Sequence, residues 1–232
     1  MIQTKIINLL NFFIHLITFD NHRNFRKKII KENKKKNDFY DYGENFFYQS
    51  IPCIKLRGLR NTKKRIDILK IQKYTKNKTI LDIGTNVGSI ILNMSENYLE
   101  AIGIDYNPKL INIANMIKNY KKKYKIKFIC GNFLNYEFNK IFDIIFSFAN
   151  HSTFDKGIND TELYFAKIKN ILSPGGLLLL ESHSPLYEKP SDFKNIISHV
   201  QEDYSILENG IYYFGNFYDQ KRAFYILKKN EV

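Results

Sequence analysis

The sequence predicts an α/β fold with a doubly wound, mostly parallel β-sheet, and two observations lead to this expectation. Short runs rich in β-branched and other apolar residues alternate with helical stretches between residues 79 and 182. Strands separated by helices join through right-handed crossovers, which makes them parallel. Two further strand-like runs, at 204–215 and 222–229, are joined by a short polar segment. They indicate an antiparallel hairpin that completes a seven-stranded sheet.

The elements alternate regularly along this part of the chain. The run FDIIFSF is almost wholly apolar, as expected of a strand that is buried on both faces. Pro108 suits the first turn of a helix, and the residues SPGG at 173–176 should end another. The expected strands cover 79–84, 100–105, 125–130, 142–148 and 176–182, and the expected helices cover 89–98, 108–120 and 161–172.

A helical N-terminal extension, residues 1–50, is expected before the main domain, residues 51–232. Its first stretch, Met1 to Phe19, is strongly apolar but is interrupted by Lys5, Asn8, Asn11 and His15. It is too polar for a membrane-spanning helix, and no small-residue cleavage site marks a signal peptide. We expect a helix that packs on the domain or on a second subunit, with a helix in the membrane interface as the sharper alternative. Residues 37–50 indicate an irregular segment, and residues 61–74 a helix.

The formal net charge of +13 is unevenly distributed. Basic blocks suit RNA or the anionic headgroups of a membrane, so peripheral membrane contact through residues 1–36 and RNA binding are both open. The abundance of Lys, Asn and Ile along the whole chain is a compositional alternative. The denser block comprises Arg23, Arg26, Lys27, Lys28, Lys31, Lys34, Lys35 and Lys36, and the smaller one Lys121, Lys122 and Lys123.

Length and cysteine usage favour a cytoplasmic protein. A chain of 232 residues buries enough apolar surface to fold without disulfides or a structural metal. Cys53 and Cys130 are far apart and form no CxxC motif, so neither a disulfide framework nor a zinc site is expected. We expect no metal.

A glycine-rich turn follows the first strand. In DIGTNVG, Gly84 allows a tight turn and close approach of a ligand to the backbone, and Gly88 allows close packing of strand and helix. The next strand ends at Asp105, an acidic residue about 20 positions after the glycines, where it can accept hydrogen bonds from ribose hydroxyls. The two features together predict a nucleoside cofactor.

These motifs resemble those of the class I S-adenosylmethionine-dependent methyltransferases, whose fold is Rossmann-like. LDIGTNVG is similar to the first motif of that family, GIDYNP to the second, GNF (131–133) to the third, FDIIFSFANHS to the fourth and LSPGGLLLLES to the strand after it. The resemblance spans about residues 50–229. It implies S-adenosylmethionine as cofactor.

The resemblance also implies roles for single residues. Asp82 and Gly84 would line the methionine end and the sugar, Asp105 would hold the ribose, and Tyr106 would lie against the adenine. Asn132 would accept a bond from the adenine amino group and Phe133 would flank the ring. Two positions depart from the usual pattern, because Asn86 replaces a glycine and Asn132 an acidic residue. The expected cofactor-binding residues are Arg60, Asp82, Gly84, Asn86, Gly88, Asp105, Tyr106, Asn132, Phe133 and Ser147.

The segment before the domain, with Arg57 and Arg60, resembles the lead-in of a branch that includes sugar and polysaccharide methyltransferases and relatives of RNA-wobble-modifying enzymes. An arginine there could clamp the carboxylate of the cofactor or a phosphate of the substrate bidentately. We favour Arg60 over Arg57, with a solvated charge as the alternative.

Two histidines follow strand ends at the edge where ligands bind in open α/β sheets. An oxygen acceptor usually needs a base, and imidazole suits proton removal near neutral pH. His151 is the first candidate and His183 the second, against the alternative that both are structural. Glu181 could be catalytic or simply a hydrogen-bonding residue.

The sequence leaves three functions open. The leading one is methyl transfer to an oxygen of a small molecule or of a sugar or glycan; ANHS, in place of the NPP[YF] signature of amino-nitrogen methyltransferases, favours oxygen. The second is RNA methylation, suggested by the basic blocks. The third is a non-catalytic cofactor-binding or membrane-associated protein. No P-loop, GxSxG motif or His/Cys metal spacing occurs.

Overall fold

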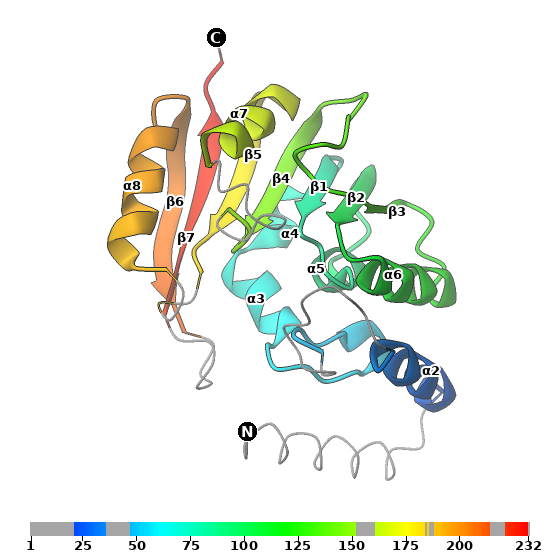
Figure 1. Ribbon diagram of the computed structural model, residues 1–232. Helices are drawn as coiled ribbons and strands as arrows, with labels where there is room; N and C mark the ends of the chain where they lie inside the picture. The colour runs from blue at the N-terminus through cyan, green and yellow to red at the C-terminus, as the bar shows by residue number, and fades with distance from the viewer. Residues whose placement is uncertain are drawn as a thin grey trace.

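The computed structural model describes residues 21–35, 47–151, 161–183, 185, 188–213 and 221–231 (Figure 1). These residues form a seven-stranded sheet with the order β3-β2-β1-β4-β5-β7-β6. The strands are β1 (Thr79–Ile83), β2 (Glu100–Asp105), β3 (Ile126–Cys130), β4 (Phe142–Phe148), β5 (Leu172–Glu181), β6 (Tyr204–Tyr212) and β7 (Arg222–Lys229). The helices are α2 (Arg23–Asn33), α3 (Thr62–Ile68), α4 (Ile71–Tyr74), α5 (Ser89–Asn93), α6 (Pro108–Tyr120), α7 (Thr161–Ile171) and α8 (Pro190–Val200), with a 3₁₀ turn, η1, at Pro52–Ile54.

The pairing of the strands confirms the predicted fold class. β3, β2, β1, β4 and β5 pair in parallel, so their carboxyl ends meet at one edge of the sheet. β7 lies antiparallel between β5 and β6, which makes β6 the outer strand. The last two strands are therefore the expected antiparallel hairpin, and β7 is its inner member.

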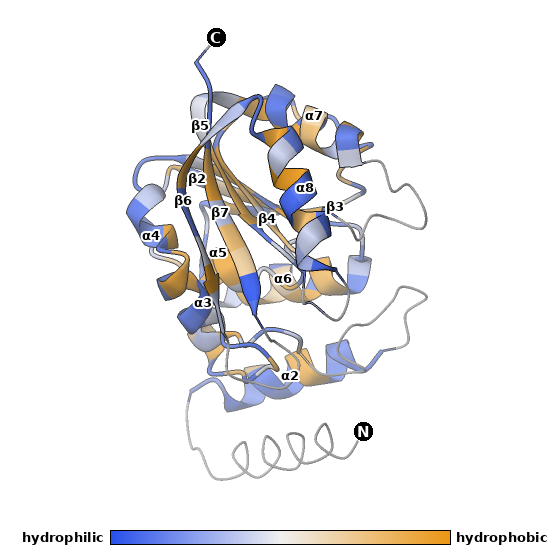
Figure 2. Ribbon diagram, turned by 90° about the vertical axis from the view of Figure 1, so that its left-hand side faces the viewer, coloured by the Kyte–Doolittle hydropathy of each residue, from blue (hydrophilic) through white to orange (hydrophobic). Residues whose placement is uncertain are grey.

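Apolar side chains on the two faces of the sheet form two cores. One core lies between the sheet and α2 to α6, with Ile80 and Phe146 among its strand residues. The other lies under α7 and α8, with Leu81 and Ile145. Alternate residues of a strand point to opposite faces, which is why neighbours in β1 and β4 enter different cores. Figure 2 shows the apolar strands between helices whose outer sides are polar.

Several boundaries differ from the sequence-based expectation. The helix expected at 61–74 is two helices, α3 and α4, because Lys70 between them has a left-handed backbone (φ 48°). α5 ends at Asn93, since Met94 is extended. β5 begins at Leu172 rather than at Gly176, because Leu172 pairs with Phe142 across an irregularity in the ladder.

One helix, α8, was not expected. Phe193, Ile197 and Val200 are its buried residues, and they recur at the spacing of one helical face. Pro190 begins the helix at a position where the missing N–H costs nothing. This pattern was visible in the sequence.

Part of the N-terminal extension is described. α2 packs against α6: Phe25 stacks on Tyr120 with ring centroids 3.9 Å apart, and Lys109 Nζ donates to the carbonyl of Asn33 at 3.2 Å. The expectations for Met1–Phe19 and for most of residues 37–50 lie outside the described residues. Within the described ranges, the structure has no helix long and apolar enough to cross a membrane.

Candidate functional site

The loop between β1 and α5 has the backbone that the glycine motif predicts. Gly84 is exposed with φ 62°, and Gly88 has φ 71°. A Cβ at Gly88 would overlap the Phe128 ring of β3, so glycine is required there for packing. Asn86, which departs from the usual glycine, also has a left-handed backbone, with φ 55°. Asn tolerates this conformation better than most other residues, which explains how the loop keeps its shape.

Asp82 is the penultimate residue of β1, just before this loop. Its side chain is buried, and Oδ2 accepts a hydrogen bond from the Thr85 hydroxyl at 2.6 Å. Burial raises the pKa of Asp82 to about 7, although the Thr85 bond acts in the opposite direction. A carboxyl group with this pKa changes its charge near neutral pH.

Asp105, at the end of β2, connects two loops of the carboxyl edge. Its Oδ2 accepts from the amide of Asn86 at 2.8 Å, and its Oδ1 accepts from the amide of Asn107 at 3.0 Å. Thr85 donates its own amide to the carbonyl of Ile104 at 3.0 Å, so the two loops are joined twice. A carboxylate has about four lone-pair positions, so Asp105 can accept further bonds from a ribose.

The remaining predicted cofactor residues follow β2 or β3 or lie in β4. Tyr106 follows Asp105 and is partly exposed. The Asn132 oxygen accepts from the amides of Leu134 (2.7 Å) and Asn135 (3.2 Å), so it closes its own loop, and its role toward adenine stays a prediction.

Phe133 and Ser147 point to the core. The Phe133 ring is buried and meets the edge of Tyr164 at 5.2 Å between centroids. Ser147 is fully buried, and its hydroxyl lies 2.7 Å from the Tyr164 hydroxyl. The Ser147 hydroxyl is thus paired with Tyr164, and its contact with the cofactor stays a prediction.

The chain after β4 turns back over the glycine loop. Ala149 has a left-handed backbone (φ 61°), a conformation that costs a non-glycine residue about 1–2 kcal/mol and is found often at functional sites. The next residue, Asn150, donates from Nδ2 to the carbonyl of Ile83 and lies so close to Gly84 that a Cβ there would overlap it. His151 is therefore adjacent to the residue that contacts the cofactor loop.

The structure brings the two predicted catalytic histidines together. The rings of His151 and His183 have centroids 6.4 Å apart, and His151 also packs on Phe193 of α8 at 5.2 Å. A carboxylate that the sequence analysis missed joins them. Glu188 Oε1 lies 2.6 Å from His151 Nε2, and Glu188 Oε2 accepts from the amide of His183 at 2.7 Å.

The two histidines differ electrostatically. Burial, together with the positive charge of Arg222, lowers the pKa of His183 to about 4. A base this weak removes a proton poorly near neutral pH. His151 has the Glu188 carboxylate 2.6 Å from its ring and is the better candidate for the base.

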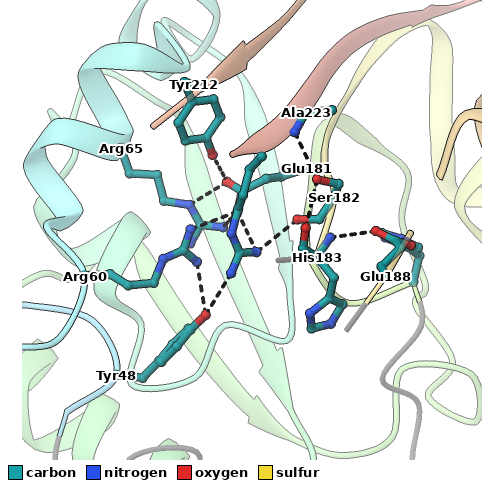
Figure 3. Close-up of polar contacts among 11 residues, drawn as sticks. Tyr48, Arg60, Arg65, Glu181, Ser182, His183, Glu188, Tyr212 and Ala223 are labelled. Carbon is teal, nitrogen blue, oxygen red and sulfur yellow. Dashed lines mark hydrogen bonds and ion pairs between the residues drawn. The ribbon is translucent and has the colours of Figure 1, made fainter. Parts of the chain in front are cut away.

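Beside this pair lies a buried ionic cluster around Glu181, the last residue of β5 (Figure 3). Arg65 of α3 binds the carboxylate bidentately, at 2.8 Å from Nε and 2.7 Å from Nη2. Arg60 and Arg222 reach Oε1 at 3.1 and 3.2 Å, and the Tyr212 hydroxyl donates to Oε2. Burial alone would raise the pKa of Glu181, but the three arginines outweigh it and hold the pKa well below its usual range. We define this set as the Glu181 cluster.

The Glu181 cluster changes the interpretation of Arg60. Arg60 was expected to clamp the cofactor; it is buried, and its guanidinium contacts Glu181 and, at 3.4 Å, the Tyr48 hydroxyl. Arg60 therefore binds the Glu181 carboxylate of this chain, and its contact with the carboxylate of the cofactor stays a prediction. Arg57, the less favoured arginine, is exposed. Glu181 accepts hydrogen bonds from side chains of several elements, which is the structural alternative that the sequence analysis gave for it.

The sequence analysis missed Glu188, Arg65, Arg222 and Tyr212. Arg65 carried a signal, because an arginine among apolar residues on a helix facing the domain needs a buried partner. Glu188, Arg222 and Tyr212 carried none, since their partners are distant in the sequence. Among the residues that the structure describes, no group of His, Cys, Asp and Glu could hold a metal ion.

Residues 74–231 match a family model described as a methyltransferase domain. The chain belongs to this family. The membership confirms the predicted class I S-adenosylmethionine-dependent methyltransferase and, with it, S-adenosylmethionine as the cofactor. The finer branch suggested by the lead-in stays a prediction.

Individual relatives are more distant. Phosphoethanolamine N-methyltransferase 2 of Caenorhabditis elegans is 28% identical over 134 residues, which is 56% of this chain and 30% of that protein. The match thus spans about a third of the length of the curated relative. The N-methyltransferase NodS from Bradyrhizobium japonicum, solved with S-adenosyl-L-homocysteine, has a TM-score of 0.61 at 14% identity, covering 90% of this chain and 99% of that one.

A second solved structure has another activity on the same fold. The [4+2]-cyclase SpnF has a TM-score of 0.60 at 13% identity, covering 73% of this chain and 81% of that one. At such identities the likeness shows the fold alone. The acceptor must be argued from the site.

The described residues fit the cofactor. Gly84 is exposed and Gly131 is half-buried, and a Cβ added at Gly131 would lie at the ordinary contact distance of 3.5 Å from its nearest neighbour, Tyr136. Asp82 is the penultimate residue of β1, and Asp105 is the last residue of β2. Asp105 would hold the ribose and Asp82 the methionine end.

Proposed function

We propose that this enzyme transfers a methyl group from S-adenosylmethionine to a proton-bearing oxygen or nitrogen of a small molecule, with His151 as the base. The observation that carries the proposal is the buried His151 imidazole, paired with Glu188 at 2.6 Å and adjacent to the residue that contacts Gly84. A base on the acceptor side is what a hydroxyl or a protonated amine requires before it can attack.

The chain's own residues have limited tasks, because the sulfonium of the bound cofactor already activates the methyl group. They align the acceptor and exclude water. As the acceptor heteroatom bonds to the methyl carbon, its proton passes to His151 and the carbon–sulfur bond breaks, leaving the electron pair on sulfur. The products are the methylated acceptor, S-adenosylhomocysteine and a protonated imidazole that returns its proton to water.

Oxygen and nitrogen acceptors have separate support. The sequence ANHS favours oxygen, and sugars or glycans stay among the proposed acceptors. The names of two relatives, phosphoethanolamine N-methyltransferase 2 and the N-methyltransferase NodS, favour nitrogen. The acceptor panel must therefore include phosphoethanolamine and ethanolamine beside sugars and small hydroxylated metabolites.

The first test is calorimetric titration of the full chain with S-adenosylhomocysteine, with NAD as control. We expect micromolar binding of S-adenosylhomocysteine alone.

Turnover of the acceptor panel is then compared between the native chain, His151→Gln and His199→Gln. His199→Gln is a matched control because His199 is exposed on α8. His151→Gln should lower kcat about 100-fold or more while cofactor affinity stays within about twofold. Full activity of His151→Gln would reject the base, and absence of cofactor binding would favour the non-catalytic alternative.

A second candidate, RNA methylation, is supported by the exposed face of α2. Lys27, Lys28 and Lys31 on α2 and Lys34 and Lys35 just after it are exposed, whereas Arg26 is buried and bonds the carbonyl of Ile54. RNA held by these lysines should be released steeply as salt increases. RNA affinity that does not depend on salt would reject this candidate.

The same lysines support the proposed peripheral membrane contact. Binding of the full chain to anionic vesicles is its test.

A further inference from the structure

The His151 imidazole has one satisfied and one unsatisfied nitrogen. Its side chain is 0% exposed, and Nε2 lies 2.6 Å from a Glu188 carboxylate that is itself only 5% exposed. Nδ1 is buried and has no hydrogen-bond partner within the described residues. A buried nitrogen without a hydrogen-bond partner is unfavourable. Such an atom points to a ligand that completes its hydrogen bonding.

The hydrogen bond to Glu188 Oε2 fixes the orientation of the carboxylate, and so keeps Oε1 directed at His151. Oε2 accepts from the amide of His183 at 2.7 Å, so the carboxylate cannot rotate without losing this bond. Burial would raise the pKa of Glu188, but the bonds from His151 and from the His183 amide outweigh burial and lower it. An ionised carboxylate only accepts hydrogen bonds. The proton of a neutral His151 must therefore be on Nε2.

We propose that Glu188 is the positioning residue of the acceptor site, which holds His151 in the Nε2–H tautomer and directs the lone pair of Nδ1 to the acceptor. The inference deepens the proposed function and rests on it for the catalytic step. When the acceptor heteroatom bonds to the methyl carbon, its proton moves to Nδ1. The imidazolium then formed is stabilised by the Glu188 carboxylate until the proton passes to water.

The groups around His151 favour His151 as the base and Glu188 as its positioning residue. The ring of His183 faces His151 from the end of β5, and Phe193 faces it from α8. Burial lowers the pKa of His183 most, followed by the charges of Arg222 and His151, and these effects outweigh the opposing charges of Glu188 and Glu181. Glu188 is the carboxylate in direct contact with the imidazole of His151.

The tautomer can be measured without any acceptor. Long-range ¹H–¹⁵N NMR spectra of ¹⁵N-histidine-labelled full chain at pH 8 distinguish a protonated from an unprotonated ring nitrogen, and His151→Gln assigns the His151 signals among the five histidines. We expect Nε2–H in the native chain. In Glu188→Gln the carboxamide oxygen should keep the bond from the His183 amide, so its NH₂ faces Nε2 and the tautomer should invert to Nδ1–H.

Kinetics supply the second measurement. Glu188→Gln should lower kcat about 100-fold with little change in the KM of the cofactor. Glu202→Gln, which alters an exposed carboxylate just after α8, is the matched control and should behave like the native chain.

The outcomes separate this inference from the proposed function. An Nδ1–H tautomer in the native chain, or an unchanged tautomer in Glu188→Gln, would overturn the positioning role. So would an inverted tautomer combined with normal kcat. Failure of S-adenosylhomocysteine to bind would instead contradict the proposed function, and the NMR result would still decide how Glu188 positions His151.

Discussion

The carboxyl edge of the sheet has two parts that are built in different ways. We call the loops around Asp82 and Asp105 the cofactor half, and the group of His151, Glu188 and the Glu181 cluster, beside which we propose that the acceptor binds, the acceptor half. In the cofactor half, Asp82 bonds a residue 3 positions away, and Asp105 bonds residues 19 and 2 positions away. In the acceptor half, Glu181 bonds Arg60 across 121 positions and Arg65 across 116, and His151 bonds Glu188 across 37. The cofactor half is thus made by consecutive strands and loops, whereas the acceptor half needs segments from both ends of the domain.

This difference has a thermodynamic consequence. Contacts between distant segments form only when the whole domain is folded, so the acceptor half should share its stability with the global fold. Contacts within one loop pair can be altered with less effect on the rest. Substitutions in the acceptor half should therefore change the free energy of unfolding, and substitutions in the cofactor half should change ligand affinity.

The largest expected effect is that of Glu181→Gln. Removing the charge leaves three arginines around a neutral amide in a buried site, and breaking a buried ion pair costs about 3–5 kcal/mol. The melting temperature should fall by roughly 10 °C in thermal unfolding monitored by circular dichroism. Because the folded-state pKa of Glu181 is lowered, its contribution is present above about pH 5 and is lost as pH falls below that value. The variant should accordingly lose less stability than the native chain on acidification.

A surface carboxylate provides the matched control. Glu208 also meets several cations and a tyrosine, with Lys70 at 2.9 Å, Lys73 at 2.6 Å and Tyr74 at 2.6 Å, but this group lies at the surface. Water and salt screen such contacts, so Glu208→Gln should shift the melting temperature by less than about 2 °C. Equal losses for the two variants would show that the Glu181 cluster is not a special source of stability.

The next effect tests the cofactor half. Asp105→Asn removes the charge that would bind the ribose but keeps an oxygen for a loop amide, so the affinity for S-adenosylhomocysteine should fall about 10- to 100-fold. The melting temperature should change little, as in Asp67→Asn, which alters an exposed carboxylate of α3. Calorimetric titration measures the affinity. A stability loss comparable to that of Glu181→Gln would break the distinction between the two halves.

The same distinction explains what the sequence could predict. The strands, the turn at Gly84 and the acidic residue at Asp105 are encoded within short windows, and the parallel order of strands then places them at one edge. His151 and His183 were predicted to follow strand ends at this edge, and they lie near each other because β4 and β5 are neighbours. Local pattern together with topology is sufficient for these features.

Long-range partners were beyond such reasoning. Arg60 was expected to bind a carboxylate bidentately, but no local pattern says that this carboxylate is Glu181, 121 positions later. Glu188 follows no strand directly and precedes the unexpected α8, so nothing in the sequence connects it with His151. Only the folded chain supplies these pairings.

The smallest expected effect concerns Asp82 and pH. Burial raises the pKa of Asp82 to about 7, so its ionised fraction rises from about 0.1 at pH 6 to about 0.9 at pH 8. If Asp82 meets the ammonium group at the methionine end, S-adenosylhomocysteine should bind about tenfold more tightly at pH 8 than at pH 6, with proton release visible as a buffer-dependent binding enthalpy. The unliganded protein should respond with the opposite sign, because a raised carboxyl pKa makes stability fall as pH rises from about 4 to 7. Asp82→Asn should abolish both dependences. A pH-independent affinity in the native chain would move the ammonium contact to another residue of the cofactor half.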